Sequence, residues 1–119
     1  RQAEAVKGRL FGWLVSYSQP DGTAIELREG RFFVTRSSLK PTDLIVDDAS
    51  VSTPHALINV GAEGKFMLQD LMSDRGVFVR RRGGDTYQRE DSAEVQHGDW
   101  LRFGDVEFLV CLIAHVGAR

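Results

Sequence analysis

The side chains that could perform catalysis are few, and they stand at positions typical of turns or of a core. A hydrolase would need paired carboxylates, a nucleophile beside a base, or a cluster of metal ligands. Asp47 with Asp48, and Asp70 with His55, come nearest to such pairs, but their spacing is that of turn and core residues. The other histidines have no partner at the spacing of metal ligands. The sequence therefore predicts no enzyme, no metal site and no cofactor.

The composition excludes several classes of partner. With 42% hydrophobic and 27% charged residues and a net charge of −2, the chain resembles an ordinary globular domain. Nothing in this balance favours nucleic acid or an anionic membrane, although Arg75 and residues 80–82 could form a local basic patch. No apolar stretch approaches the length of about 20 residues that a membrane span requires. The lone Cys111 stands in an apolar run, which fits a reducing, cytoplasmic setting.

Most of the chain alternates between short apolar runs and turn residues. Turn signals such as Pro20-Asp21-Gly22 and Gly104-Asp105 separate the runs, and no segment has a convincing helical period. The clearest expected strands are residues 13–17, 23–27, 31–36, 44–46, 56–60, 65–70, 76–79, 100–103 and 106–113. This pattern predicts an all-β fold, a two-sheet antiparallel β-sandwich of about ten or eleven short strands.

The length of 119 residues is that of one domain. We expect residues 1–9 to be a linker or frayed N-terminus, residues 10–114 to be the domain, and residues 115–119 to be a C-terminal tail. Because the chain begins with Arg1 and not with Met, we expect it to be part of a larger protein. The two ends should lie near each other.

Five short segments occur in a specific order along the chain. They are Thr35-Arg36, residues 43–48, Ser52-Thr53-Pro54-His55-Ala56, residues 68–79 and residues 98–104. Together they resemble the motifs of forkhead-associated (FHA) domains, and the resemblance extends over roughly residues 10 to 113. It implies an FHA/SMAD-like sandwich that binds phosphothreonine-containing proteins and catalyses nothing. Such a domain would serve a larger signalling protein and would depend on a Ser/Thr kinase.

The resemblance also implies the residues of a phosphopeptide site: Arg36, Ser52, Thr53 and Arg75. Arginine stays charged and offers a fixed fork of donors that matches phosphate, so Arg36 is the expected main ligand. Ser52 and, more weakly, Thr53 would donate hydroxyl hydrogens. These residues should stand on loops at one edge of the sandwich, away from the chain ends.

Two further residues are expected to support the site without touching the ligand. The resemblance implies that the ring of His55 bonds to backbone groups and holds the phosphate-binding loop. Gly76 would permit the turn that follows Arg75, because glycine adopts backbone conformations that are costly for other residues.

Three positions depart from the family pattern. Thr35 replaces a glycine, Arg75 replaces an asparagine that grips the peptide backbone, and Asp74 stands where relatives often have a hydroxyl residue. A carboxylate about 4 Å from a phosphate would repel it by several kcal/mol. Either Asp74 turns away to pair with Arg75 or Arg80, or phosphate binding is lost. In the second case the domain would make phosphate-independent intramolecular or oligomeric contacts.

Overall fold

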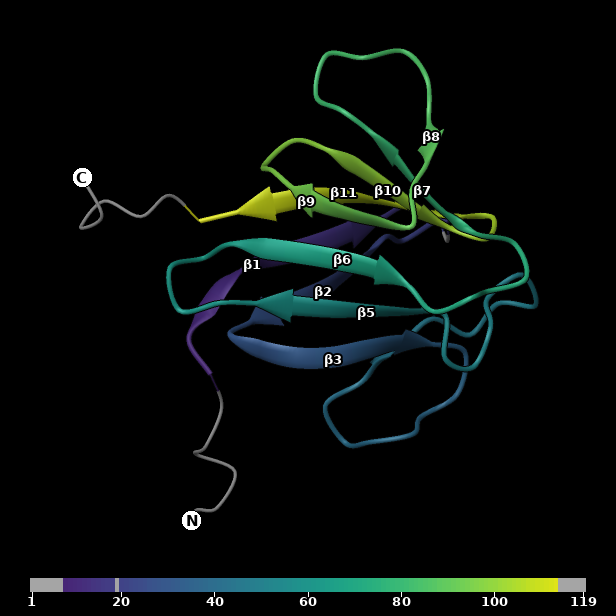
Figure 1. The fold of residues 1–119 in the computed structure, drawn as a ribbon, viewed down its shortest axis with the longest axis horizontal. Coiled ribbons are helices and arrows are strands. Elements are labelled where there is room, and N and C mark those ends of the chain that lie inside the picture. The colour runs from purple at the N-terminus through teal and green to yellow at the C-terminus, as the bar shows by residue number, and fades with distance from the viewer. Residues whose placement is uncertain (1–7, 19, 114–119) are drawn as a thin grey trace.

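The computed structural model describes residues 8–18 and 20–113, which form two β-sheets packed face to face (Figure 1). These residues contain eleven strands and no helix, and hence no helix long and apolar enough to cross a membrane. The predicted all-β sandwich of about ten or eleven short strands is therefore confirmed. The tail expected at residues 115–119, and all of the expected linker except Gly8 and Arg9, lie outside the described residues.

The two sheets have six and five strands. The larger one has the order β2 (Thr23–Arg28), β1 (Leu10–Ser16), β11 (Val106–Leu112), β10 (Trp100–Phe103), β7 (Val77–Arg80) and β8 (Gln88–Arg89). The smaller one has the order β4 (Leu44–Ile45), β3 (Gly30–Thr35), β5 (Ala56–Val60), β6 (Phe66–Asp70) and β9 (Ser92–Val95). Sequence analysis did not foresee β8 and β9, because both are short and rich in polar residues.

The core lies between the sheets and follows the alternation of the strands. Successive side chains of a strand point to opposite faces, so each strand contributes every second residue to the interior. The largest fully buried apolar side chains are Phe66, Phe103, Leu14, Leu27, Ile58, Leu68, Leu101, Val34, Val77, Val79 and Val95. Each one contributes about 1.5–3 kcal/mol by leaving water, which makes the sandwich a rigid base for its loops.

Neighbouring strands are antiparallel except β3 and β4, which run parallel. The loop between them returns the chain to the same end of the sheet, and Asp43 holds this loop in shape. One carboxylate oxygen of Asp43 accepts the N–H of Phe33 at 3.3 Å, and the other accepts those of Leu39 and Lys40 at 2.9 and 2.7 Å. Arg36 begins this loop, one residue after β3 ends.

The described ends of the chain lie at one end of the sandwich. β1 and β11 are antiparallel neighbours with Gly12 opposite Leu112, so both described ends leave the sheet side by side. The β10–β11 turn and the loops before β5 and β7 lie at the other end, on the right of Figure 1. The predicted closeness of the two chain ends concerns residues that lie outside the described part of the chain.

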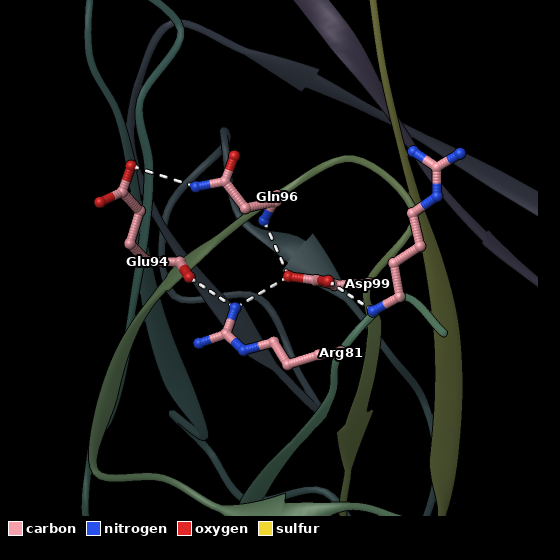
Figure 2. Close-up of polar contacts among 5 residues, drawn as sticks. Arg81, Glu94, Gln96 and Asp99 are labelled. Carbon is pink, nitrogen blue, oxygen red and sulfur yellow. Dashed lines mark hydrogen bonds and ion pairs between the residues drawn. The ribbon is translucent and has the colours of Figure 1, made fainter. Parts of the chain in front are cut away.

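A buried carboxylate ties the β7–β8 loop to the β9–β10 turn (Figure 2). Asp99 is only 2% exposed. One of its oxygens accepts the N–H of Arg82 at 3.0 Å, and the other accepts the N–H of Gln96 at 2.9 Å and a guanidinium N–H of Arg81 at 2.8 Å. The same nitrogen of Arg81 donates to the carbonyl of Glu94.

The three arginines at residues 80–82 make different contacts. Arg81 binds Asp99, and the stem of Arg82 lies against Gly98. Arg80 instead stacks over the rings of Tyr87 and Trp100, at 5.5 and 5.2 Å from their centroids. Arg81 thus forms an ion pair, Arg80 stacks on aromatic rings, and Arg82 packs its stem against a glycine.

We expect Asp99→Ala to lower the free energy of unfolding by about 2–4 kcal/mol, because two backbone N–H groups and one guanidinium lose a buried acceptor. Chemical denaturation of the two proteins measures the difference. Asp85→Ala, an exposed change in the β7–β8 loop, is the control and should stay within about 0.5 kcal/mol of wild type. Equal losses in the two variants would contradict the role given to Asp99.

Candidate functional site

The loops opposite the described chain ends enclose an open depression of about 490 Å³. Three separate segments line it: Arg36, the residues Ala49, Ser50, Val51, Ser52, Thr53 and Pro54, and the residues Leu71, Met72, Asp74 and Arg75. All four residues that sequence analysis assigned to ligand binding, Arg36, Ser52, Thr53 and Arg75, are therefore brought together. They stand on loops at one edge of the sandwich, as expected from the sequence.

Arg36 is exposed, and its backbone is fixed on both sides. Its N–H donates to the carbonyl of Ser52 at 3.1 Å. The preceding Thr35 is buried at the end of β3, and its hydroxyl donates to the carbonyl of Ser37 at 2.8 Å. Thr35 thus continues the strand and shapes the turn beyond it. The guanidinium of Arg36 makes no hydrogen bond or ion pair with any residue that the structure describes, so it is available to an anion.

Ser52 is held by two hydrogen bonds that leave its hydroxyl hydrogen available. Its N–H donates to Nδ1 of His55 at 3.0 Å, and its Oγ accepts the N–H of Asp74 at 3.1 Å. A hydroxyl that accepts one bond can still donate its own hydrogen. Thr53, which follows, is exposed and lines the same depression. Ser52 and Thr53 therefore line a depression that Arg36 also borders.

His55 lies beneath the depression with no exposed surface and connects two of its loops. Because Nδ1 accepts the N–H of Ser52, Nε2 carries the hydrogen and donates it to the carbonyl of Gly76 at 2.8 Å. The ring also packs edge-on against Phe103, with centroids 5.8 Å apart. Both ring nitrogens thus bond to backbone groups, and neither is free to touch a ligand.

Side chains of the turn before β7 hold that turn in shape. Asp70 accepts the N–H of Ser73 at 3.1 Å, and Oγ of Ser73 accepts the N–H of Gly76 at 3.0 Å. Gly76 has φ +90, a conformation that side chains disfavour. Met72 has φ +57 and is 95% exposed at the rim of the depression. Asp70 and His55, the pair considered for catalysis, are therefore both engaged in loop structure.

Sequence analysis missed a second layer of support, formed by Asp48, Ser50 and Asp105. Asp48 accepts both the hydroxyl and the N–H of Ser50, at 2.6 and 3.0 Å. Oγ of Ser50 in turn accepts the N–H of Asp105 at 2.8 Å. The bonds from Ser50, followed by the positive charges of Arg36 and Arg75, outweigh desolvation and lower the pKa of Asp48 below its usual value. The sequence signal for this support was Asp48 two positions before Ser50, a spacing at which a carboxylate can accept hydrogen bonds from a serine.

The ion pairs differ from those expected for Asp74. Arg75 pairs with Asp105, with 3.8 Å between Nη1 and Oδ2, and Arg80 stacks on aromatic rings elsewhere. The carboxylate of Asp74 has no hydrogen bond or ion pair with the part of the chain that the structure describes. Of the two alternatives that the sequence left open for Asp74, the structure does not show the pairing with Arg75 or Arg80, because other contacts engage both arginines.

Histidine, cysteine and acidic residues form no cluster that could hold a metal ion within residues 8–18 and 20–113. The arrangement at the depression instead combines two arginines, two hydroxyls and a set of fixed loops. These groups are suited to hold an anion by charge and by hydrogen bonds.

A family model and the similar solved structures point to the same family. The family model described as FHA domain matches residues 28–104. The FHA domain of the CT664 protein from Chlamydia trachomatis is 25% identical, with a TM-score of 0.70 over 88% of this chain and 99% of that one. A structure from a study of phosphothreonine-dependent FHA domain interactions is 21% identical, with a TM-score of 0.70 over 89% of this chain and 99% of that one.

Mycobacterium tuberculosis EmbR, solved in complex with a low affinity phosphopeptide, is 25% identical, with a TM-score of 0.69 over 91% of this chain. Only 26% of the EmbR chain is covered, so the present chain corresponds to about a quarter of it. A search of curated proteins gave no match.

We expect His55→Ala to lower the free energy of unfolding by about 2–4 kcal/mol, because a buried ring and two hydrogen bonds are lost. Thermal and chemical denaturation measure the effect. His97→Ala is a suitable control, since the exposed His97 accepts one hydrogen bond, from Leu112. A stable His55→Ala variant would contradict the view that this ring holds the loops together.

The pKa of Asp48 gives a pH-dependent prediction. Because the pKa of Asp48 in the folded protein lies below the ordinary aspartate value of 3.8, ionised Asp48 stabilises the fold above that pH, and the contribution is lost as pH falls through the folded pKa. Asp48→Asn, which imitates the protonated form, should be less stable than wild type at pH 7. The difference should close below pH 3.8. Denaturation at several pH values tests this, and a gap that persists in acid would contradict it.

Proposed function

The chain belongs to the FHA domain family, and from this premise we propose that it is a phosphothreonine-dependent protein-interaction module of a larger signalling protein. FHA domains are interaction modules and not enzymes. The observation that carries the proposal is the convergence of Arg36, Ser52, Thr53 and Arg75 from three chain segments on one depression. The proposed partner is a protein that a Ser/Thr kinase has phosphorylated, and the proposed location is the cytoplasm.

In the proposed complex, Arg36 is the main phosphate ligand. Its guanidinium is exposed and makes no hydrogen bond or ion pair with a described residue, so no such contact must break before it binds. A phosphate dianion offers several strong acceptor oxygens, and arginine can bind two of them in parallel. The backbone bond from Arg36 to Ser52 keeps the two ligands in register.

Ser52, Thr53 and Arg75 complete the proposed site. Ser52 donates its free hydroxyl hydrogen to the phosphate, and Thr53 can add a second, weaker bond. Arg75 stands where an asparagine is usual, and it can donate to peptide carbonyls but cannot accept from peptide N–H groups. Its pairing with Asp105 at 3.8 Å is long and exposed, so the guanidinium can turn towards a ligand at little cost.

A second candidate is a degenerate FHA domain that makes phosphate-independent intramolecular or oligomeric contacts. The observation that favours it is the carboxylate of Asp74, which borders the depression and is not neutralised by any described residue. A wild-type protein that binds no phosphothreonine peptide would support this candidate over the first.

We expect Arg36→Ala to lose about 2 kcal/mol or more of binding free energy, roughly a 30-fold weaker affinity, while the fold stays intact. Titration calorimetry with a peptide selected from a degenerate phosphothreonine library measures the change. The affinity of Arg36→Lys should lie between those of wild type and Arg36→Ala, because lysine keeps the positive charge but cannot form two parallel hydrogen bonds with the phosphate.

The matched control is Arg31→Ala, which removes the same charge from an exposed position in β3, the strand that precedes Arg36, outside the depression. It should bind like wild type. Equal affinities of wild type and Arg36→Ala would refute the assignment of Arg36.

A further inference from the structure

Asp74 borders the depression as an anion that the protein itself does not neutralise. Its N–H donates to Oγ of Ser52 at 3.1 Å, so its backbone lies beside a proposed phosphate ligand. The carboxylate is therefore within one side-chain length of that hydroxyl. It is exposed, and no described residue gives it a hydrogen bond or an ion pair. A bound phosphate would be repelled by this carboxylate, and the repulsion would offset part of its attraction to the arginines of the depression.

The other carboxylates around the depression are engaged. Asp48 accepts two hydrogen bonds from Ser50, and Asp105 pairs with Arg75. Arg36 makes no hydrogen bond or ion pair with a described residue, and neither does the carboxylate of Asp74. The rim thus has two cations, Arg36 and the loosely paired Arg75, and one anion, Asp74, that makes no hydrogen bond or ion pair with a described residue. A ligand that matches it would carry a phosphate and, close by, a positive charge.

Resting on the proposed function, we propose that this site selects phosphothreonine peptides with a lysine or arginine near the phosphothreonine, and that Asp74 is the residue that determines this specificity. In such a complex Arg36 binds the phosphate, and Asp74 binds the neighbouring cation of the peptide. Peptides without a basic residue leave Asp74 facing the phosphate alone. The carboxylate therefore lowers affinity for these peptides and raises it for basic ones, which is discrimination by charge.

This proposal predicts opposite effects of one substitution on two ligands. Asp74→Asn keeps the size and the backbone N–H of the residue and removes only its charge. It should weaken binding of a basic peptide and strengthen binding of a neutral one. A residue that only shaped the loop would change both affinities in the same direction, so the opposite signs identify a charge effect.

The first experiment uses a peptide library with fixed phosphothreonine and randomised flanking positions, together with the same library unphosphorylated. Wild type should retain the phosphorylated pool and enrich lysine or arginine at one or more flanking positions. Asp74→Asn should retain the pool without that enrichment. Glu63→Gln, an equal charge change in the exposed β5–β6 loop, is the control and should enrich like wild type.

The second experiment titrates one enriched peptide and its lysine-to-glutamine counterpart into wild type and Asp74→Asn. We expect wild type to prefer the lysine peptide by about two- to fivefold, as for an exposed ion pair, and Asp74→Asn to lose or reverse the preference. Raising sodium chloride from about 0.05 to about 0.5 M should reduce the wild-type preference.

The outcomes separate this inference from the proposed function. If wild type retains no phosphorylated peptide over its unphosphorylated form, the proposed function fails and the inference falls with it. If wild type retains phosphorylated peptides but enriches no basic residue, the function stands and the inference is overturned. The inference is also overturned if Asp74→Asn keeps the basic preference unchanged.

Discussion

The buried ring of His55 is the contact on which the site depends. Its two nitrogens bond the backbone of Ser52 on one side and of Gly76 on the other, so two loops far apart in sequence share one support. A buried imidazole without partners would cost free energy, and here both nitrogens are satisfied inside the core. The geometry of the loops is thus coupled to the packing of the sandwich, through the contact of this ring with Phe103.

The loops keep their shape through short side-chain to backbone bonds of the same kind. Asp43, Asp48, Asp70 and Ser73 each accept N–H groups within a few residues of themselves. Such bonds satisfy backbone groups that have left the sheets and lower the entropy lost when a ligand binds. The exposed guanidinium of Arg36 and the hydroxyl of Ser52 therefore stand on ordered backbone, although neither belongs to a strand.

Sequence patterns predicted the strands and turns, which depend on neighbouring residues. They did not predict side-chain pairs between segments that are far apart in the sequence. Alternating apolar residues and turns were enough for the sandwich and most strands, whereas two-residue β8 carries no apolar signal. The motif order placed Arg36, Ser52 and Arg75 in one region. It could not give the partner of Arg75, because Asp105 reaches it from the β10–β11 turn. The sequence therefore left two alternatives open for Asp74, and the structure does not show the one in which it pairs with Arg75 or Arg80.

The same reasoning explains why net charge says little about this molecule. A total of −2 is close to neutral, yet the depression has exposed arginines and the exposed carboxylate of Asp74 at one rim. The free energy of binding at such a rim depends on where the positive and negative charges lie along the ligand and not on the ligand's net charge. An unpaired carboxylate beside an anion site costs affinity for simple phosphate ligands, and it gives discrimination among phosphorylated ones. Asp74 can thus be read as a means of selectivity within a phosphate site, because a single charge both repels the wrong ligand and binds the right one.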